Sequence, residues 1–153
     1  LVREGAGSIP ITDERMTRFW ITLNQSVDFV LSSLNIMRGG EVFVPKIASM
    51  KILDVVKALA PNIPIKVVGI RPGEKLHEVM ITQDDARTTQ DLGGFYIIQP
   101  AFQMWTIDKG LSKGAVPVSE DFSYTSDTNS SWLNVSDLMR LINEELRGLM
   151  ETL

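Results

Sequence analysis

Arginine and glutamate at one predicted turn are the residues of this chain best suited to chemistry. The run Arg71-Pro72-Gly73-Glu74 follows a β-branched segment over 65–70, so we expect it at the carboxyl end of a strand, where open α/β sheets place their ligands. A guanidinium binds phosphate oxygens through two parallel bonds, and Glu74 can accept hydrogen bonds from sugar hydroxyls. The pattern predicts anion recognition. Because the run is short, the alternative is that its arginine pairs at the surface with an acidic side chain such as Asp13, Glu14 or Glu74.

Two further arginines, Arg15 and Arg18, flank Met16-Thr17 in a polar stretch just before the first predicted helix. Pairing with a neighbouring carboxylate at the surface is the alternative for them too.

The other titratable groups are weaker indications of a functional site than these arginines. His77 is the single histidine, and we expect a structural or surface role, although imidazole can transfer protons near neutral pH. Glu74 and Glu78 have the spacing of one helix face, which favours a solvated face over a catalytic carboxylate pair. Cysteine is absent, which excludes a disulfide scaffold, a thiol nucleophile and a Cys-ligated metal site. We therefore expect no metal centre.

The chain carries no nucleotide-binding loop of its own. Gly5-Ala6-Gly7 lacks the third glycine, the preceding strand and the following helix of a dinucleotide fingerprint. No glycine-rich loop with Gly-Lys-Ser/Thr is present either. The residues indicate anion recognition without visible catalytic chemistry.

Composition predicts one soluble globular unit. The 153 residues are 44% hydrophobic and 22% charged, enough to bury a sizeable core. The net charge of −4 argues against general affinity for nucleic acid, and no apolar run reaches the roughly 18 residues of a membrane-spanning helix. The first residues lack a starter Met and a signal-peptide pattern. We expect a cytoplasmic protein that begins at a cut end.

Periodicity and turn residues predict an α/β order of elements. We expect strands near 7–12, 41–45, 65–70 and 95–98. Helices are expected over 27–37, stopped by Gly39-Gly40, over a segment capped by Ser49, over 74–81, and over 136–150. The apolar stripe of the second helix, which we expect to be buried, comprises Ile52, Val55, Val56 and Leu59. Residues 101–134 are expected to form an irregular loop region within a single portion spanning 1–153.

Two long motifs make the sequence resemble a known family. The motifs run from Pro10 to Leu23 and from Gly69 to Glu78, and shorter matches lie at 40–51, 122–129 and 132–133. The chain resembles the C-terminal half of inverting UDP-N-acetylglucosamine 4,6-dehydratases, which belong to the extended short-chain dehydrogenase/reductase superfamily. The fold implied is the C-terminal, substrate-binding portion of a Rossmann-type enzyme, without its N-terminal Rossmann half.

The resemblance implies a reaction and its ligands. Such enzymes hold NADP on the N-terminal half and UDP-sugar mainly on the C-terminal part. They oxidise C4 of UDP-N-acetylglucosamine, eliminate water across C5 and C6, and return hydride to C6 with inversion at C5. The product serves pseudaminic acid synthesis for flagellin glycosylation, or a related surface-glycan route, and the family commonly assembles into homo-oligomers.

The resemblance also assigns residues. Arg18 and Arg71 match the two arginines that grip the UDP diphosphate, and Glu74 matches the acid near the uridine ribose. Ile9, Pro10 and Ile11 match the segment whose backbone faces the uracil.

The chain departs from the family in lacking the catalytic Tyr-x-x-x-Lys pair. Tyr96 is followed four residues later by Pro100, and Tyr124 by Thr128. We therefore expect this chain to bind the UDP part of the substrate without turnover. A stand-alone UDP-sugar-binding or assembly module, a related nucleotide-sugar epimerase and the retaining dehydratase subtype are the alternatives.

Overall fold

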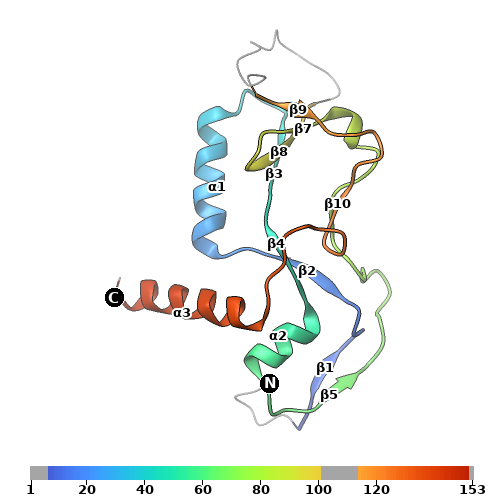
Figure 1. Ribbon diagram of the computed structural model, residues 1–153, viewed down its shortest axis with the longest axis vertical. Helices are drawn as coiled ribbons and strands as arrows, with labels where there is room; N and C mark the ends of the chain where they lie inside the picture. Colours follow the sequence, from blue (N-terminus) through green and yellow to red (C-terminus); the bar gives the residue numbers. More distant parts are fainter. Residues whose placement is uncertain (1–6, 101–113, 152–153) are drawn as a thin grey trace. The chain divides into compact units, whose positions relative to one another are not determined.

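The computed structural model describes residues 7–100 and 114–151 (Figure 1). The chain divides into two compact units. The first unit comprises residues 1–22, 48–78 and 126–153, and the second comprises 23–47 and 79–125. Both units mix strands with helices, so the expected α/β class is confirmed.

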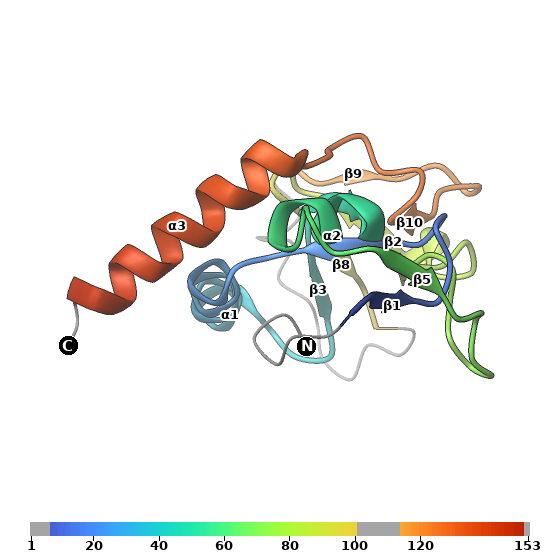
Figure 2. The same ribbon diagram turned by 90° about the horizontal axis from the view of Figure 1, so that it is seen from below.

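The first unit contains two pairs of strands. Strand β1 (Ile9–Ile11) pairs in parallel with β5 (Ile65–Val67), and the two lie side by side in Figures 1 and 2. Strand β2 (Thr17–Trp20) pairs antiparallel with β4 (Ala48–Lys51), whose other side bonds to the backbone of Ser131 and Leu133. The sequence pattern missed β2 and β4, because neither strand alternates apolar and polar residues.

Helices α2 (Ile52–Leu59) and α3 (Val135–Glu151) complete the first unit and contact each other. Helix α3 begins with a reciprocal cap, in which Asn134 and Asp137 each accept the other's backbone N–H through a side-chain oxygen. The predicted helix over 136–150 is confirmed. Leu138 of α3 and Met50 of β4 are fully buried and mark the core of this unit.

Two expectations about α2 are wrong. Ser49 does not cap the helix, because it lies buried in β4 and accepts a hydrogen bond from Asn129 Nδ2. Lys51 stands at the N-cap position without a side-chain bond. The stripe is only partly buried: Val56 is 9% exposed and Leu59 is 52% exposed.

The second unit is built on an antiparallel four-stranded sheet in the order β3-β8-β7-β9. Its strands are β3 (Val42–Pro45), β8 (Phe95–Ile98), β7 (Thr89–Asp91) and β9 (Val116–Pro117). A 3-10 turn, η1 (Ala86–Thr88), leads into β7, and β6 (Val79–Ile81) pairs antiparallel with β10 (Tyr124–Thr125). The predicted strands over 41–45 and 95–98 are confirmed.

Helix α1 (Leu23–Ile36) belongs to the second unit and confirms the predicted first helix. Phe29 meets Phe95 of β8 edge to face at 6.0 Å between ring centroids. Past the helix, the Glu41 carboxylate accepts the backbone N–H of Arg38 and Gly39. The apolar stripe is exposed by 45% to 58% at Val27, Val30, Leu31, Leu34 and Met37. Periodicity thus predicted the helix correctly without predicting what its stripe contacts.

Part of the region expected to be irregular falls outside the described residues. Residues 101–113 lie there, while residues 114–134 contain the short strands β9 and β10 joined by turns. Within the described ranges, no helix has the length and apolar character needed to cross a membrane.

The hydroxyl of Tyr124 is the basis of a stability prediction for the second unit. It donates to the carbonyl of Ile47 and accepts from the N–H of Ile47, both at 2.9 Å. Each bond contributes about 0.5–1.5 kcal/mol. We expect Tyr124→Phe to lower the free energy of unfolding by about 1–2 kcal/mol at pH 7, measured by urea denaturation. Tyr96→Phe is the matched control, because Tyr96 packs on Tyr124 with its ring, 5.3 Å between centroids.

The Tyr124 hydroxyl also leads us to expect a loss of stability at alkaline pH. Burial raises the pKa of Tyr124 above its ordinary value, so the folded protein retains the phenolic proton where the unfolded chain releases it. Stability from this group is complete below the unfolded pKa of about 10 and is lost as the pH rises through the higher folded pKa. Tyr124→Phe should flatten this alkaline fall. An equally steep fall in the variant would contradict the assignment.

Candidate anion-binding site

The candidate site is the segment from Arg71 to Glu78, which follows β5 in the first unit. Its first four residues form a reciprocal turn: Glu74 N–H donates to the Arg71 carbonyl at 3.0 Å, and Arg71 N–H donates to Glu74 Oε2 at 3.1 Å. Gly73 has φ +82°, a left-handed conformation that glycine adopts without strain. The predicted tight turn is therefore confirmed.

The short helix expected over 74–81 is wrong. Residues 74–78 are turn and irregular backbone, and Val79–Ile81 form β6. A helix would need the carbonyls of Lys75 and Leu76 for its own ladder, but these carbonyls accept bonds from Arg18. Glu74 and Glu78 consequently do not share a helix face and have different partners.

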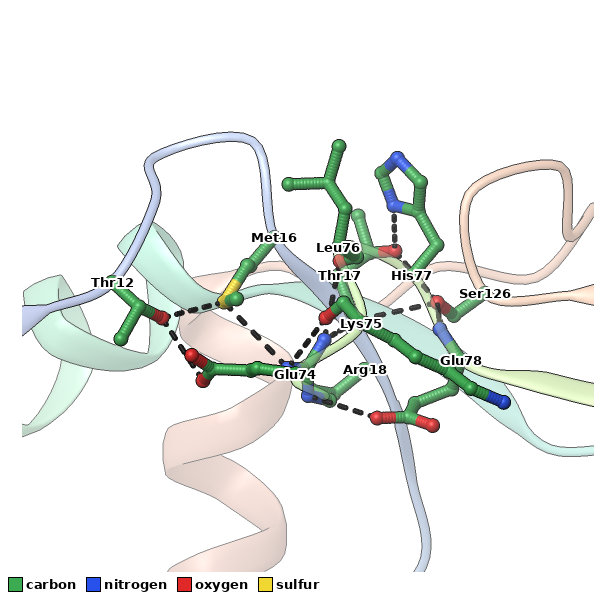
Figure 3. A network of polar contacts seen from close by, with 10 residues as sticks. All are labelled: Thr12, Met16, Thr17, Arg18, Glu74, Lys75, Leu76, His77, Glu78 and Ser126. Carbon is green, nitrogen blue, oxygen red and sulfur yellow. Dashed lines mark hydrogen bonds and ion pairs between the residues drawn. The ribbon is translucent and has the colours of Figure 1, made fainter. Parts of the chain in front are cut away.

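Glu74 joins the turn to strand β1. Besides accepting Arg71 N–H with Oε2, its carboxylate accepts the Thr12 hydroxyl with Oε1 at 3.1 Å (Figure 3). The strands on either side are also connected, because Val68 N–H donates to the Ile11 carbonyl at 2.8 Å. The structure therefore brings three of the predicted site residues together: Ile11, Arg71 through its backbone, and Glu74.

Strand β1 pairs with β5 along one of its two edges. The backbone of Ile9 donates to Pro64, and that of Ile11 accepts from Val68, so both residues face β5. Because alternate residues of a strand direct their polar groups to opposite edges, the Pro10 carbonyl points away from β5. Pro10 is exposed. The β1 backbone thus offers an acceptor beside the turn.

The guanidinium of Arg18 is bonded entirely inside the protein. Its two Nη1 hydrogens have the carbonyls of Thr17 at 2.7 Å and Leu76 at 3.2 Å as acceptors. Nη2 donates to the Lys75 carbonyl at 3.0 Å and to the Met16 sulfur at 3.6 Å, and Nε lies 3.3 Å from Glu78 Oε1. Figure 3 shows the contact of this side chain with the Glu78 carboxylate. All three guanidinium nitrogens therefore have neighbours in the protein: the two Nη atoms make hydrogen bonds, and Nε is in an ion pair with Glu78.

The arginines singled out in the sequence, Arg15, Arg18 and Arg71, differ in what they contact. Arg15 forms a two-pronged pair with Asp13 at 2.9 and 2.8 Å, and this hydrogen bonding lowers the pKa of Asp13 to about 2. The surface-pairing alternative therefore describes Arg15. Arg71 is exposed, and within residues 7–100 and 114–151 no side chain or carbonyl binds its guanidinium. It is a cation available to a ligand.

A hydroxyl network anchors the far end of the segment. Thr17 Oγ1 lies 2.8 Å from His77 Nδ1 and 2.6 Å from Ser126 Oγ (Figure 3). Ser126 Oγ also accepts Glu78 N–H, and Ser126 N–H donates to the Glu78 carbonyl, both at 2.9 Å. Thr17 and Ser126 are buried, so their hydroxyls hold the segment and do not face a substrate. His77 has the structural role expected of it.

Sequence reasoning missed Thr12, Thr17 and Ser126 as parts of this site. Hydroxyl residues are common, and Thr17 and Ser126 lie 109 positions apart, so no local pattern connects them. Among the described residues, no group of acidic and histidine side chains is arranged to hold a metal ion.

Comparisons with known proteins agree with the sequence resemblance. A family model described as "Polysaccharide biosynthesis protein" matches residues 1–100. The chain is 48% identical over 148 residues to a UDP-N-acetylglucosamine 4,6-dehydratase (inverting) of Campylobacter jejuni, covering 94% of this chain and 44% of that protein. It is 33% identical over 150 residues to a UDP-glucose 4-epimerase of Rickettsia akari, covering 92% of this chain and 44% of that protein.

A solved structure has the same fold. Pen from Bacillus thuringiensis superimposes with a TM-score of 0.75 at 26% identity, over 94% of this chain and 43% of that one. The chain thus spans less than half the length of the relatives it matches. These matches confirm the expected likeness to inverting dehydratases and to the extended short-chain dehydrogenase/reductase superfamily.

Ser126→Ala tests the hydroxyl network. The change leaves the half-buried Glu78 N–H and the buried Thr17 hydroxyl without this partner, so we expect a loss of about 1–3 kcal/mol in the free energy of unfolding, measured by urea denaturation. Ser130→Ala, an exposed serine in the same loop, should change it by less than about 0.5 kcal/mol. Equal effects of the two changes would show that the network contributes nothing.

Proposed function

Because the chain belongs to the polysaccharide biosynthesis protein family, we propose that it forms the UDP-binding portion of an inverting UDP-N-acetylglucosamine 4,6-dehydratase. The activity and substrate are those that the names of the Campylobacter jejuni relatives state. The geometry of the Arg71–Glu78 segment supports the binding role.

The observation that carries the proposal is the position of the Arg71 guanidinium, which no other group among the described residues binds, on a turn fixed by Glu74. A nucleoside diphosphate needs a cation for its phosphates and polar groups for its sugar and base. Arg71 supplies the cation, and a guanidinium can bind two phosphate oxygens at once. The Glu74 carboxylate connects this cation to β1 by accepting both Arg71 N–H and the Thr12 hydroxyl.

The rest of the nucleoside fits groups next to the turn. A carboxylate has about four acceptor positions, so Glu74 retains capacity for ribose hydroxyls beyond the two hydrogen bonds that it accepts from Thr12 and Arg71. The exposed Pro10 carbonyl, flanked by Ile9 and Ile11, can accept the imide N–H of uracil. These are the roles that the family resemblance assigns to the same residues.

The cofactor and the chemistry belong to other parts of the enzyme in this proposal. NADP, which the resemblance implies, supplies hydride transfer at the sugar. The described residues do not fit it, because no glycine-rich turn joins a strand to a helix and Gly7 leads into the short strand β1. The chain's own contribution is to bind and orient the UDP part of the substrate.

The wider setting is part of the proposal. We place the enzyme in the cytoplasm as a homo-oligomer, where its 4-keto-6-deoxy product would enter pseudaminic acid or another surface-glycan route. The description of the matched family, polysaccharide biosynthesis, supports the surface-glycan route in this proposal.

A UDP-sugar 4-epimerase is the second candidate. The Rickettsia relatives carry that name, at 33% identity for Rickettsia akari. The UDP-binding role would be the same in both enzymes, so the product distinguishes them.

Replacing Arg71 tests the diphosphate assignment. In the full-length protein, Arg71→Ala removes a charge-assisted bond at the phosphates, and we expect UDP binding to weaken by about 1.5–3 kcal/mol, roughly 10- to 150-fold in Kd. Isothermal titration with UDP measures the change. Arg15→Ala is the matched control, because the Arg15 guanidinium is bonded to Asp13. Unchanged affinity in Arg71→Ala would refute the assignment.

Product analysis tests the reaction. Incubation of the full-length protein with UDP-N-acetylglucosamine and NADP should release a 4-keto-6-deoxy sugar nucleotide, identified by NMR and by the mass lost as water. An isomer of unchanged mass would instead establish the epimerase. Binding without either product would leave the chain as a UDP-sugar-binding module.

A further inference from the structure

The Thr12 hydroxyl links strand β1 to the turn that carries Arg71. Thr12 directly follows β1, and its Oγ1 lies 3.1 Å from Glu74 Oε1 and 2.9 Å from Met16 Sδ (Figure 3). A hydroxyl has one hydrogen to donate, and an ionised carboxylate is a stronger acceptor than a thioether. The hydrogen therefore goes to Glu74, and the thioether is a packing neighbour.

The Glu74 carboxylate is held at both of its oxygens. Oε1 accepts the Thr12 hydroxyl and Oε2 accepts the Arg71 N–H, both at 3.1 Å. Each carboxylate oxygen offers two lone pairs, so one acceptor position is left on each oxygen. Two donors that approach together, one for each oxygen, therefore suit this carboxylate better than a single donor.

A vicinal cis-diol supplies two such donors. The 2′- and 3′-hydroxyls of a ribose stand on neighbouring carbons on the same side of the ring, so both can donate to one carboxylate. A 2′-deoxyribose lacks one of them and leaves one carboxylate oxygen without its second donor. Because hydrogen bonds to a charged acceptor are stronger than those between neutral groups, the missing hydroxyl should weaken binding.

Thr12 also fixes the carboxylate relative to the strand next to it. Glu74 lies 62 positions from Thr12 along the chain, whereas Pro10, whose carbonyl is the proposed acceptor for uracil, is two residues away. Ile11, between them, accepts the Val68 N–H at 2.8 Å. Base and ribose are joined by a single bond, so a site for both must hold its acceptors at a fixed separation. The Thr12 hydroxyl connects these two acceptors directly.

We propose that Thr12 is a positioning residue: its hydroxyl orients the Glu74 carboxylate as a two-point acceptor for the ribose diol, and the site thereby selects UDP over 2′-deoxy-UDP. The ligand in this statement rests on the proposed function, which places the ribose at Glu74 and gives the Thr12 side chain no role in selecting the sugar.

Titration of the full-length protein with UDP and with 2′-deoxy-UDP tests the proposal, and the ratio of the two Kd values is the readout. We expect wild type to bind 2′-deoxy-UDP about tenfold or more weakly than UDP. Thr12→Val keeps the shape of the side chain without its hydroxyl and should reduce this ratio to about threefold or less. Thr12→Ser keeps the hydroxyl and should retain the ratio. A purely structural role would weaken both nucleotides alike and leave the ratio unchanged.

Two further variants serve as controls. Thr82→Val removes a hydroxyl that also donates to a carboxylate, that of Asp85, in the second unit, and it should change neither Kd. Glu74→Gln should itself lower the ratio to about threefold or less. Adding Thr12→Val to it should change the ratio by less than about twofold, because residues that act as a unit are non-additive. A ratio that stays near tenfold in Thr12→Val or in Glu74→Gln would overturn the proposal, as would its loss in Thr12→Ser.

The outcomes separate this proposal from the proposed function. A wild type that binds neither nucleotide refutes the proposed function and, with it, the ligand of this proposal. A wild type that binds UDP and 2′-deoxy-UDP equally refutes the selection by ribose and leaves UDP binding intact. Thermal unfolding verifies that each variant is folded. Should Thr12→Val not fold, Thr12→Ala removes the hydroxyl without placing a methyl group beside the carboxylate, and the same expectation applies to it.

Discussion

The site depends on one constraint: the backbone polar groups of residues 75–78 must be satisfied without a helix or a strand. Buried or half-buried N–H and C=O groups require partners, and here side chains provide them. Arg18 donates to the carbonyls of Lys75 and Leu76, and the Ser126 hydroxyl oxygen accepts the N–H of Glu78. At the start of the turn, the Glu74 carboxylate accepts the N–H of Arg71. The segment is irregular in conformation and is nevertheless held at both ends.

This arrangement decides which charges are available to a ligand. Arg15 is paired with Asp13, and Arg18 is surrounded by acceptors, whereas the Arg71 guanidinium has no bonded partner in the described part of the chain. A protein with a net charge of −4 can still bind an anion at such a point, because the local free cation matters more than the total. Glu74 does not neutralise this cation directly, since its carboxylate contacts the Arg71 backbone and Thr12.

Local sequence patterns predicted correctly those helices and strands whose own residues carry the pattern. The helices around 27–37 and 136–150 follow from their apolar periodicity, and the strand at 95–98 follows from its β-branched and aromatic residues. The pattern failed where partners are distant. Ser49 has the side chain of a helix cap but is buried in β4, and residues 74–78 have helical spacing but bond to Arg18. In both places tertiary bonds outweigh a weak local preference.

From the amino-acid sequence alone it was possible to predict that Arg71 and Glu74 lie on a tight turn after a strand, that the chain has no phosphate loop, and which family it resembles. Each of these rests on neighbouring residues or on long motifs. The tertiary structure was needed to show that Arg18 is bonded within the protein, whereas the Arg71 guanidinium has no bonded partner among residues 7–100 and 114–151. The acceptors of Arg18 lie 57 and 58 positions away along the chain, and the hydroxyl partner of Thr17 lies 109 away. Both arginines have the same side chain, so their difference arises from which carbonyls the fold brings within hydrogen-bonding distance.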